Sequence, residues 1–156
     1  MNTQQINEPA LDWTTAIARI APARAIYEAA GRELDVAERA YGAESVPEPS
    51  GMIIYMRGQS FTFEQSQENL KRDWEAWHKH DQELQERFRI DPLETAFADA
   101  VDSFVQAVRD AMATPAPDLP ALRWKLEQVL DGTVGAALDT KENAAALRAD
   151  MNRLLA

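Results

Sequence analysis

The sequence predicts an all-α protein, an antiparallel bundle of about five helices, three long and two short, with a small β-hairpin-like insertion at 52–63. Two observations predict the helices: apolar residues recur every three or four positions, and capping residues or prolines separate these stretches. A short β-type run between two loops predicts the insertion. We expect one helical domain over 1–156, with a flexible polar start over 1–10.

The first long helix is expected over about 12–42, because its apolar residues follow the 3-4 spacing of a coiled-coil-like seam. The seam positions are Trp13, Ala16, Ile20, Ala23, Tyr27, Ala30, Leu34, Ala37 and Tyr41. The seam stays in phase across Pro22, so this proline predicts a kink rather than a break. Gly42 stands where a helix C-cap is expected. The many alanines let another helix approach closely, which favours self-association.

The stretch 43–61 is predicted to be a loop with a β-like insertion, since two prolines and a glycine precede a short apolar run. Apolar segments that carry methionine dock onto other proteins, and a β-type run can offer an edge for strand addition. The run supplies the first candidate interaction residues: Ile53, Ile54, Tyr55, Met56 and Arg57. The alternative is that the run folds over the helices and covers their core.

The second long helix is expected over about 62–90, where Thr62 and Gln65 match a capping box. Its apolar face comprises Leu70, Trp74, Trp77, Leu84 and Phe88. Asp81 falls on this face, where an apolar residue is expected, and a buried carboxylate needs a partner. Asp81 is therefore the buried polar candidate: either it fixes the register of a helix pair, or the seam opens to solvent at its level.

Glu75 and His78 match half of the di-iron motif of ferritin-like bundles, which needs a second such motif and two further carboxylates. The other histidine is His80, and on a helix the two imidazoles point about 200° apart. The glycines are scattered and form no phosphate-binding loop. We therefore predict no metal site, no cofactor and no catalytic residue.

The third long helix is expected over 92–113, with Asp91 as its N-cap, Pro92 as its first residue and Glu94 completing a capping box. Its predicted inward face comprises Leu93, Phe97, Val101, Phe104, Val108 and Met112. Prolines then predict a bend over 114–118.

Charges four residues apart on the helices predict solvated faces rather than catalytic ones, because an acid preceding a base stabilises a helix by roughly 0.2–0.5 kcal/mol. The predicted pairs are Glu28/Arg32, Asp35/Arg39, Glu68/Arg72, Glu75/Lys79 and Glu83/Arg87.

The two shorter helices are expected over 119–131 and 140–155, the latter after a capping box of Asp139 and Glu142. The residues expected to be buried are Leu119, Leu122, Leu126 and Val129 in the former and Ala144, Leu147, Met151 and Leu154 in the latter. Trp124 lies off the leucine face, so either a second face of its helix is buried or the indole is exposed for a partner. Trp124 is the second candidate interaction residue.

Composition limits the function classes. The chain has 26 Asp and Glu against 16 Lys and Arg, and its net charge of −10 disfavours direct binding to nucleic acids. It has no cysteine, which excludes disulfides and cysteine-bound metals. It shows neither a secretory start nor an apolar window of about 20 residues, so we expect a cytoplasmic protein without a membrane partner.

These observations predict a non-enzymatic protein–protein interaction module, a helical adaptor or accessory factor that also forms homo-oligomers. The alternative is an acidic inhibitor, a nucleic-acid mimic that occupies a basic surface of a partner protein; an enzyme with carboxylate chemistry is the third hypothesis. The alanine-rich helices and the segment PAPDLPALRWKLE at 115–127 resemble small helical proteins encoded in bacterial prophages. That resemblance assigns no functional residue.

Overall fold

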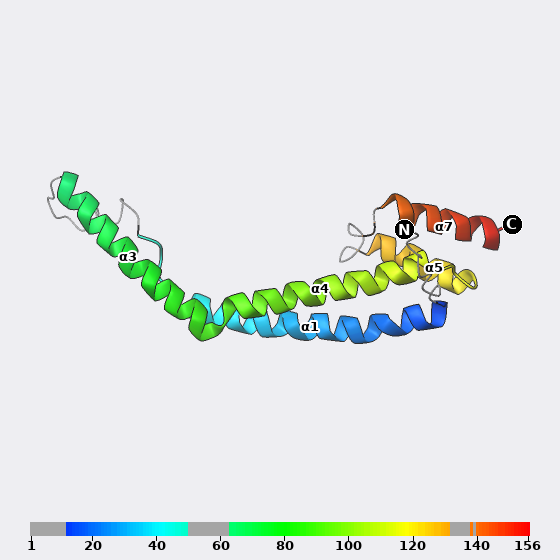
Figure 1. The fold of residues 1–156 in the computed structure, drawn as a ribbon, viewed down its shortest axis with the longest axis horizontal. Helices are drawn as coiled ribbons and strands as arrows, with labels where there is room; N and C mark the ends of the chain where they lie inside the picture. The colour runs from blue at the N-terminus through cyan, green and yellow to red at the C-terminus, as the bar shows by residue number, and fades with distance from the viewer. Residues whose placement is uncertain (1–11, 50–62, 132–137, 139) are drawn as a thin grey trace, which may run out of the picture. The chain divides into compact units, whose positions relative to one another are not determined.

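The computed structural model describes residues 12–49, 63–131, 138 and 140–156, and these contain five α-helices and no strand (Figure 1). The helices are α1 (Trp13–Glu44), α3 (Phe63–Phe88), α4 (Ile90–Ala113), α5 (Leu119–Leu130) and α7 (Lys141–Leu154). The all-helical prediction is confirmed for this part of the chain. The start at 1–10 and the insertion at 52–63 lie outside the described residues, except that Phe63 begins α3. The predicted β-hairpin-like insertion at 52–63 is therefore wrong at Phe63, which is helical.

The contacts divide the chain, which was expected to form one domain, into two compact units. Unit 1 comprises Met1–Ala29 and Ala98–Ala156, and unit 2 comprises Ala30–Phe97. Both α1 and α4 therefore contribute residues to each unit.

Unit 1 is built on an antiparallel pair formed by the first half of α1 and the second half of α4 (Figure 1). Arg19 forms an ion pair of 3.8 Å with Asp110, and further along α1 the ring of Tyr27 stacks on Phe104 at 5.5 Å. The buried core of this unit consists of Phe104, Val108, Met112 and Leu138, with Ile20, Ala23, Tyr27, Val105 and Trp124 packed against it. The contact partners on α4 therefore decrease in residue number as those on α1 increase, so the two helices are antiparallel in this unit.

The seam predicted on α1 is confirmed, because each of its residues from Trp13 to Tyr41 is buried or half-buried. The predicted inward face of α4, from Leu93 to Met112, is buried or half-buried as well. Pro22 lies within α1 without ending the helix, as predicted. The C-cap predicted at Gly42 is wrong, since α1 continues to Glu44, where the Ser45 amide donates to the Tyr41 carbonyl at 2.8 Å.

Unit 2 joins the end of α1 to α3 and to the first turns of α4. Arg87 of α3 forms an ion pair with Glu44 of α1, and the indole Nε1 of Trp77 donates to the Val46 carbonyl at 2.9 Å. A Cβ at Gly31 would stand only 3.3 Å from Cε2 of Phe97. The absence of a side chain at Gly31 therefore lets α1 approach α4 closely in this unit.

The break between α3 and α4 lies at Arg89, whose φ of 56° is the left-handed conformation that L side chains rarely adopt. The Leu93 amide donates to the Arg89 carbonyl at 3.1 Å, which makes Arg89 the N-terminal boundary of α4. The predicted N-cap at Asp91 is therefore wrong by two residues. Asp91 and Pro92 lie in the first helical turn, where a missing proline N–H removes no hydrogen bond.

The helix charges pair differently from the prediction. Among the described ion pairs, Asp35 and Arg39 form the predicted contact. Other carboxylates instead take the basic residue on their N-terminal side: Arg24–Glu28, Lys71–Glu75 and Lys79–Glu83. Both arrangements bring charges four residues apart onto one face, so they keep these faces solvated as expected.

The two C-terminal helices begin at side-chain caps. Asp118 accepts from the Ala121 amide at 2.9 Å and starts α5, while Thr140 accepts from the Asn143 amide at 3.2 Å and starts α7. The cap of α7 is thus Thr140, one residue after the predicted Asp139. In unit 1 α5 and α7 lie beside the end of α4 (Figure 1).

Candidate functional site

The structure describes two of the residues singled out from the sequence, Asp81 and Trp124. The candidate run from Ile53 to Arg57 lies outside the described residues. Trp124 is half-buried and meets Trp13 of α1 edge-on, with ring centroids 5.6 Å apart. Of the two alternatives for Trp124, the structure therefore shows a packed second face of α5.

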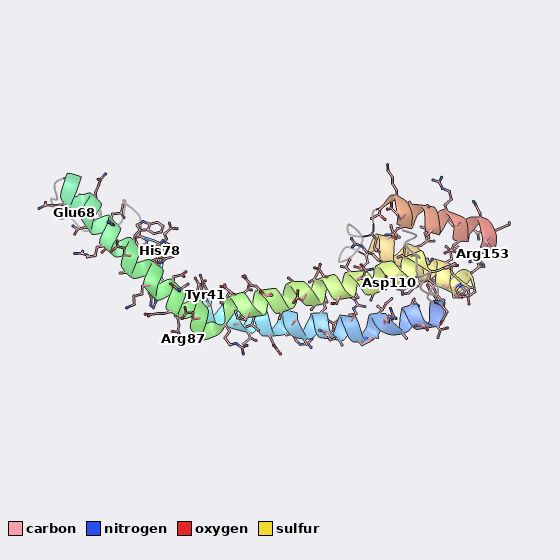
Figure 2. The ribbon with its side chains drawn as sticks, in the orientation of Figure 1. Tyr41, Glu68, His78, Arg87, Asp110 and Arg153 are labelled. Carbon is pink, nitrogen blue, oxygen red and sulfur yellow. The ribbon has the colours of Figure 1, made fainter. Side chains whose placement is uncertain are left out.

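Asp81 lies half-buried in unit 2 and both of its carboxylate oxygens are engaged. The Tyr41 hydroxyl donates to Oδ1, and Nε2 of Gln85 donates to Oδ2 at 2.8 Å. The hydrogen bond to Asp81, then burial and then the negative charge of Asp81 raise the pKa of the Tyr41 phenol. This pair joins α1 to α3 at a fixed level (Tyr41 is labelled in Figure 2), so Asp81 acts as a register contact between the helices.

An aromatic group lies on α3 of unit 2. The exposed His78 ring is 4.8 Å from the Trp74 ring and 5.0 Å from the Trp77 ring, measured between centroids. Beside Trp74 an open hollow of about 570 Å³ is lined by apolar and charged residues: Gln67, Glu68, Leu70, Lys71 and Trp74. Within the described ranges, no three His, Asp or Glu side chains come close enough to hold a metal ion.

The strongest polar cluster of unit 1 is a buried ion pair between Lys125 of α5 and Asp150 of α7. The Lys125 side chain is 0% exposed, and its Nζ lies 2.6 Å from Oδ2 of Asp150. The same ammonium donates to the carbonyl of Met112 at 2.8 Å and to that of Thr114 at 2.5 Å. It also lies 5.6 Å from the centre of the Trp13 ring. All three ammonium protons therefore have an acceptor, which a buried lysine requires.

Asp150 is the second centre of this cluster. Its Oδ1 accepts from the Ala116 amide at 3.0 Å and from Arg153 at 2.9 Å, and Arg153 also donates to the Ala116 carbonyl. Burial on its own would raise the pKa of Asp150. Hydrogen bonds from Lys125, Arg153 and the Ala116 amide, together with the charge of Lys125, outweigh burial and hold this pKa below its ordinary value. The carboxylate is therefore ionised when the protein is folded at neutral pH.

The cluster completes the end of α4. The last turn of a helix leaves carbonyls without an intrahelical partner, and a cation at that end is also favoured by the helix dipole. Here Oγ1 of Thr114 donates to the Asp110 carbonyl at 2.8 Å, and Lys125 caps the Met112 carbonyl. Ala116 lies between two prolines, so its amide is an isolated donor that Asp150 satisfies.

The cluster also decides which side of α5 faces inward. The buried residues of α5 are Ala121, Leu122 and Lys125. The predicted burial of Leu119, Leu126 and Val129 is wrong, because these side chains are exposed, as is Leu130 at 85%. On α7 the predicted burial of Ala144 and Met151 is wrong as well, while Asn143 and Asp150 are buried in their place.

We define the apolar face of α5 as the exposed side chains Leu119, Leu126, Val129 and Leu130. Next to it, Leu122 packs in a buried cluster with Ala116 and Ala121, and Leu147 and Leu154 of α7 lie against that cluster. Sequence reasoning missed the orientation of this face, because Leu122 shares the leucine side of α5 and is nevertheless buried, so the spacing does not tell the buried leucine from the exposed ones.

No helix within the described ranges combines the length and the apolar character that crossing a bilayer requires. No family model, no curated protein and no solved structure matches this chain.

Proposed function

We propose that this protein is a non-enzymatic interaction module that binds another protein through the apolar face of α5. The observation that carries the proposal is the exposure of four large aliphatic side chains on one short helix, with Leu130 exposed at 85%. Scattered exposed apolar residues are ordinary, but a contiguous exposed group on one element is typical of a binding surface.

The base of this surface is fixed. Lys125 and Asp150 hold α5, α7 and the end of α4 together by direct hydrogen bonds. A binding face that is already held in place loses little conformational entropy when a partner docks. The cluster therefore supports an interaction role by orienting the face, without itself contacting the partner.

The buried and half-buried polar side chains already have hydrogen-bonding partners within the protein, which supports a non-enzymatic role. Each oxygen of Asp81 and Asp150 accepts a hydrogen bond from another group of the protein, and Lys125 has all its protons engaged. A general acid or base must reach a proton of the substrate. The side chains of Asp81, Lys125 and Asp150 bind internal partners instead.

Photo-crosslinking tests the proposal. A photoreactive amino acid at Leu130 should yield a protein adduct in cells of the source organism. The same residue at Glu142, which is exposed on the polar side of α7, is the matched control and should yield little. Equal adducts at both positions, or none at Leu130, would contradict the proposal. An adduct at Leu130 that forms equally well at high salt would argue against the acidic-mimic alternative.

A further inference from the structure

We propose that the partner on the apolar face of α5 is a second copy of this chain, with the two α5 helices antiparallel about a two-fold axis. This inference rests on the proposed function and names the partner of the same surface. Three properties of α5 carry it: the spacing of its leucines, the placement of two charges beside them, and the exposure of both.

The leucines form one stripe. Leu126 and Leu130 follow Leu119 by seven and eleven residues, so at about 100° per residue all three lie within roughly 20° of one line along the helix. The stripe runs the length of α5, from its first residue, Leu119, to its last, Leu130. Such a stripe can pack against an identical stripe along the whole helix.

The charges lie along one edge of the stripe. Arg123 and Glu127 are displaced from the leucine line by about 40° and 80° in one direction, and Val129 by about 80° in the other. Arg123 and Glu127 form an ion pair of 2.8 Å within the helix, and their side chains are 82% and 54% exposed. An exposed pair of this kind contributes little to stability, so exchanging its partners costs little.

These positions are self-complementary when α5 pairs with itself in the antiparallel direction. A two-fold axis near Lys125 brings Leu119 to the level of Leu130 in the other copy, and Arg123 to the level of Glu127. In an antiparallel helix pair, each edge of one helix meets the same edge of its neighbour. Arg123 then faces Glu127 of the other copy, and the same contact repeats on the other side of the axis.

A parallel pairing lacks this match, because it sets the charged edge of one helix against the edge that carries Val129 in the other. Charge complementarity therefore selects the antiparallel dimer. Since α5 has only 12 residues, the contact is small, and we expect a weak dimer in rapid exchange with the monomer.

Analytical ultracentrifugation of the full chain over roughly a hundredfold range of concentration tests the inference. The wild type should shift from monomer toward dimer as concentration rises. Leu130→Asp should keep the chain monomeric, and because Leu130 is exposed, circular dichroism should show an unchanged fold. A wild type that stays monomeric throughout, or a dimer that Leu130→Asp leaves intact, would overturn the inference.

Charge reversal tests the geometry. Arg123→Glu or Glu127→Arg alone should weaken the dimer by roughly three- to tenfold, because two repulsive contacts replace two attractive ones. The double variant Arg123→Glu/Glu127→Arg should restore the wild-type affinity. The control Glu142→Arg, a charge reversal on the exposed side of α7, should change nothing. A double variant no better than the single variants would exclude the antiparallel pairing.

The two proposals fail in distinguishable ways. If the chain stays monomeric while the photoreactive residue at Leu130 captures a different protein, the interaction role stands and the self-pairing is wrong. If Leu130 captures nothing and no dimer forms, both are wrong.

Discussion

In α1 and α4 the apolar residues of the 3-4 pattern face inward, whereas in α5 and α7 several apolar residues face solvent and charged residues are buried. Both regions show helical periodicity. On the long helices the inward stripe contains few groups that need a hydrogen-bonding partner. The C-terminal helices must also satisfy the end of α4: Lys125 donates to the Met112 carbonyl from its buried side, and Asp150 is the counter-charge of Lys125. Periodicity thus identifies an apolar face, while tertiary hydrogen bonding decides whether that face points inward.

Breaking the buried ion pair should have the largest effect. Asp150→Asn leaves the Lys125 ammonium buried without its counter-charge, and we expect a loss of about 3–5 kcal/mol in the free energy of unfolding. Urea denaturation followed by circular dichroism measures it. Asp102→Asn, which removes an exposed carboxylate of α4, is the control and should change stability little. A loss below about 1 kcal/mol would mean that the pair does not hold unit 1 together.

Acid should also weaken this ion pair. The folded pKa of Asp150 lies below the value of 3.8 expected for the unfolded chain, so the unfolded state binds the proton more readily. The stabilisation that the ionised Asp150 carboxylate gives to the fold is complete well above this value. It is lost as the pH falls through 3.8 toward the lower folded pKa. Unfolding measured across this range should depend less steeply on pH in Asp150→Asn than in the wild type.

Truncating two leucines of α5 tests the orientation of the helix directly. Leu122 is 4% exposed and Leu130 is 85% exposed. We expect Leu122→Ala to cost about 2–4 kcal/mol because it leaves a cavity, and Leu130→Ala to change stability by less than about 0.5 kcal/mol. Thermal unfolding at low protein concentration compares them without interference from association. Equal losses would show that the Leu130 side chain is buried as well as that of Leu122.

Tyr41→Phe tests whether the register contact of unit 2 matters as much as the ion pair of unit 1. In the variant, Asp81 keeps its hydrogen bond from Gln85 and its other oxygen gains access to water. We therefore expect a loss of about 1 kcal/mol or less in the free energy of unfolding. Because folding raises the pKa of Tyr41, the stabilisation from its protonated hydroxyl is complete at neutral pH. This stabilisation is lost as the pH rises through the folded pKa, above 10. If the wild type and Tyr41→Phe had the same free energy of unfolding from neutral to alkaline pH, the Tyr41–Asp81 hydrogen bond would not stabilise unit 2.

Arg89→Gly should have a small effect, in the opposite direction to the losses above. Glycine adopts a positive φ without the steric cost that arginine bears, while its greater freedom in the unfolded chain offsets part of the gain. We expect a net stabilisation of about 0.5 kcal/mol, measured by thermal unfolding. Destabilisation would indicate that the arginine side chain makes a contact worth more than the strain.

The positions of the helices could be predicted from the sequence because they depend on local signals. The predicted and observed ranges of α1, α3, α4, α5 and α7 agree within about two residues at each end. The break between α3 and α4 was predicted at Asp91, two residues late, since any residue can occupy the left-handed conformation at a cost and only packing shows that Arg89 does so. Glu28 has an arginine four residues away on either side, so spacing alone does not say which one it binds.

The candidate site was harder to predict than the fold. Asp81 stood out because it interrupts an apolar face, and its contact with Tyr41 joins the two helices at that position. Lys125 and Asp150 interrupt no pattern, since each lies among the polar positions of its own helix. Their burial depends on unpaired carbonyls at the end of α4 and on the isolated Ala116 amide, which are tertiary features.

The contact between Lys125 and Asp150 also has a consequence for the order in which unit 1 assembles. The two residues are 25 positions apart, and α5 is synthesised before α7. Until Asp150 is present, docking α5 would bury an ammonium ion without a counter-charge, which is strongly unfavourable. We therefore expect α5 to remain undocked until α7 arrives, so that both helices join the end of α4 in a single cooperative step.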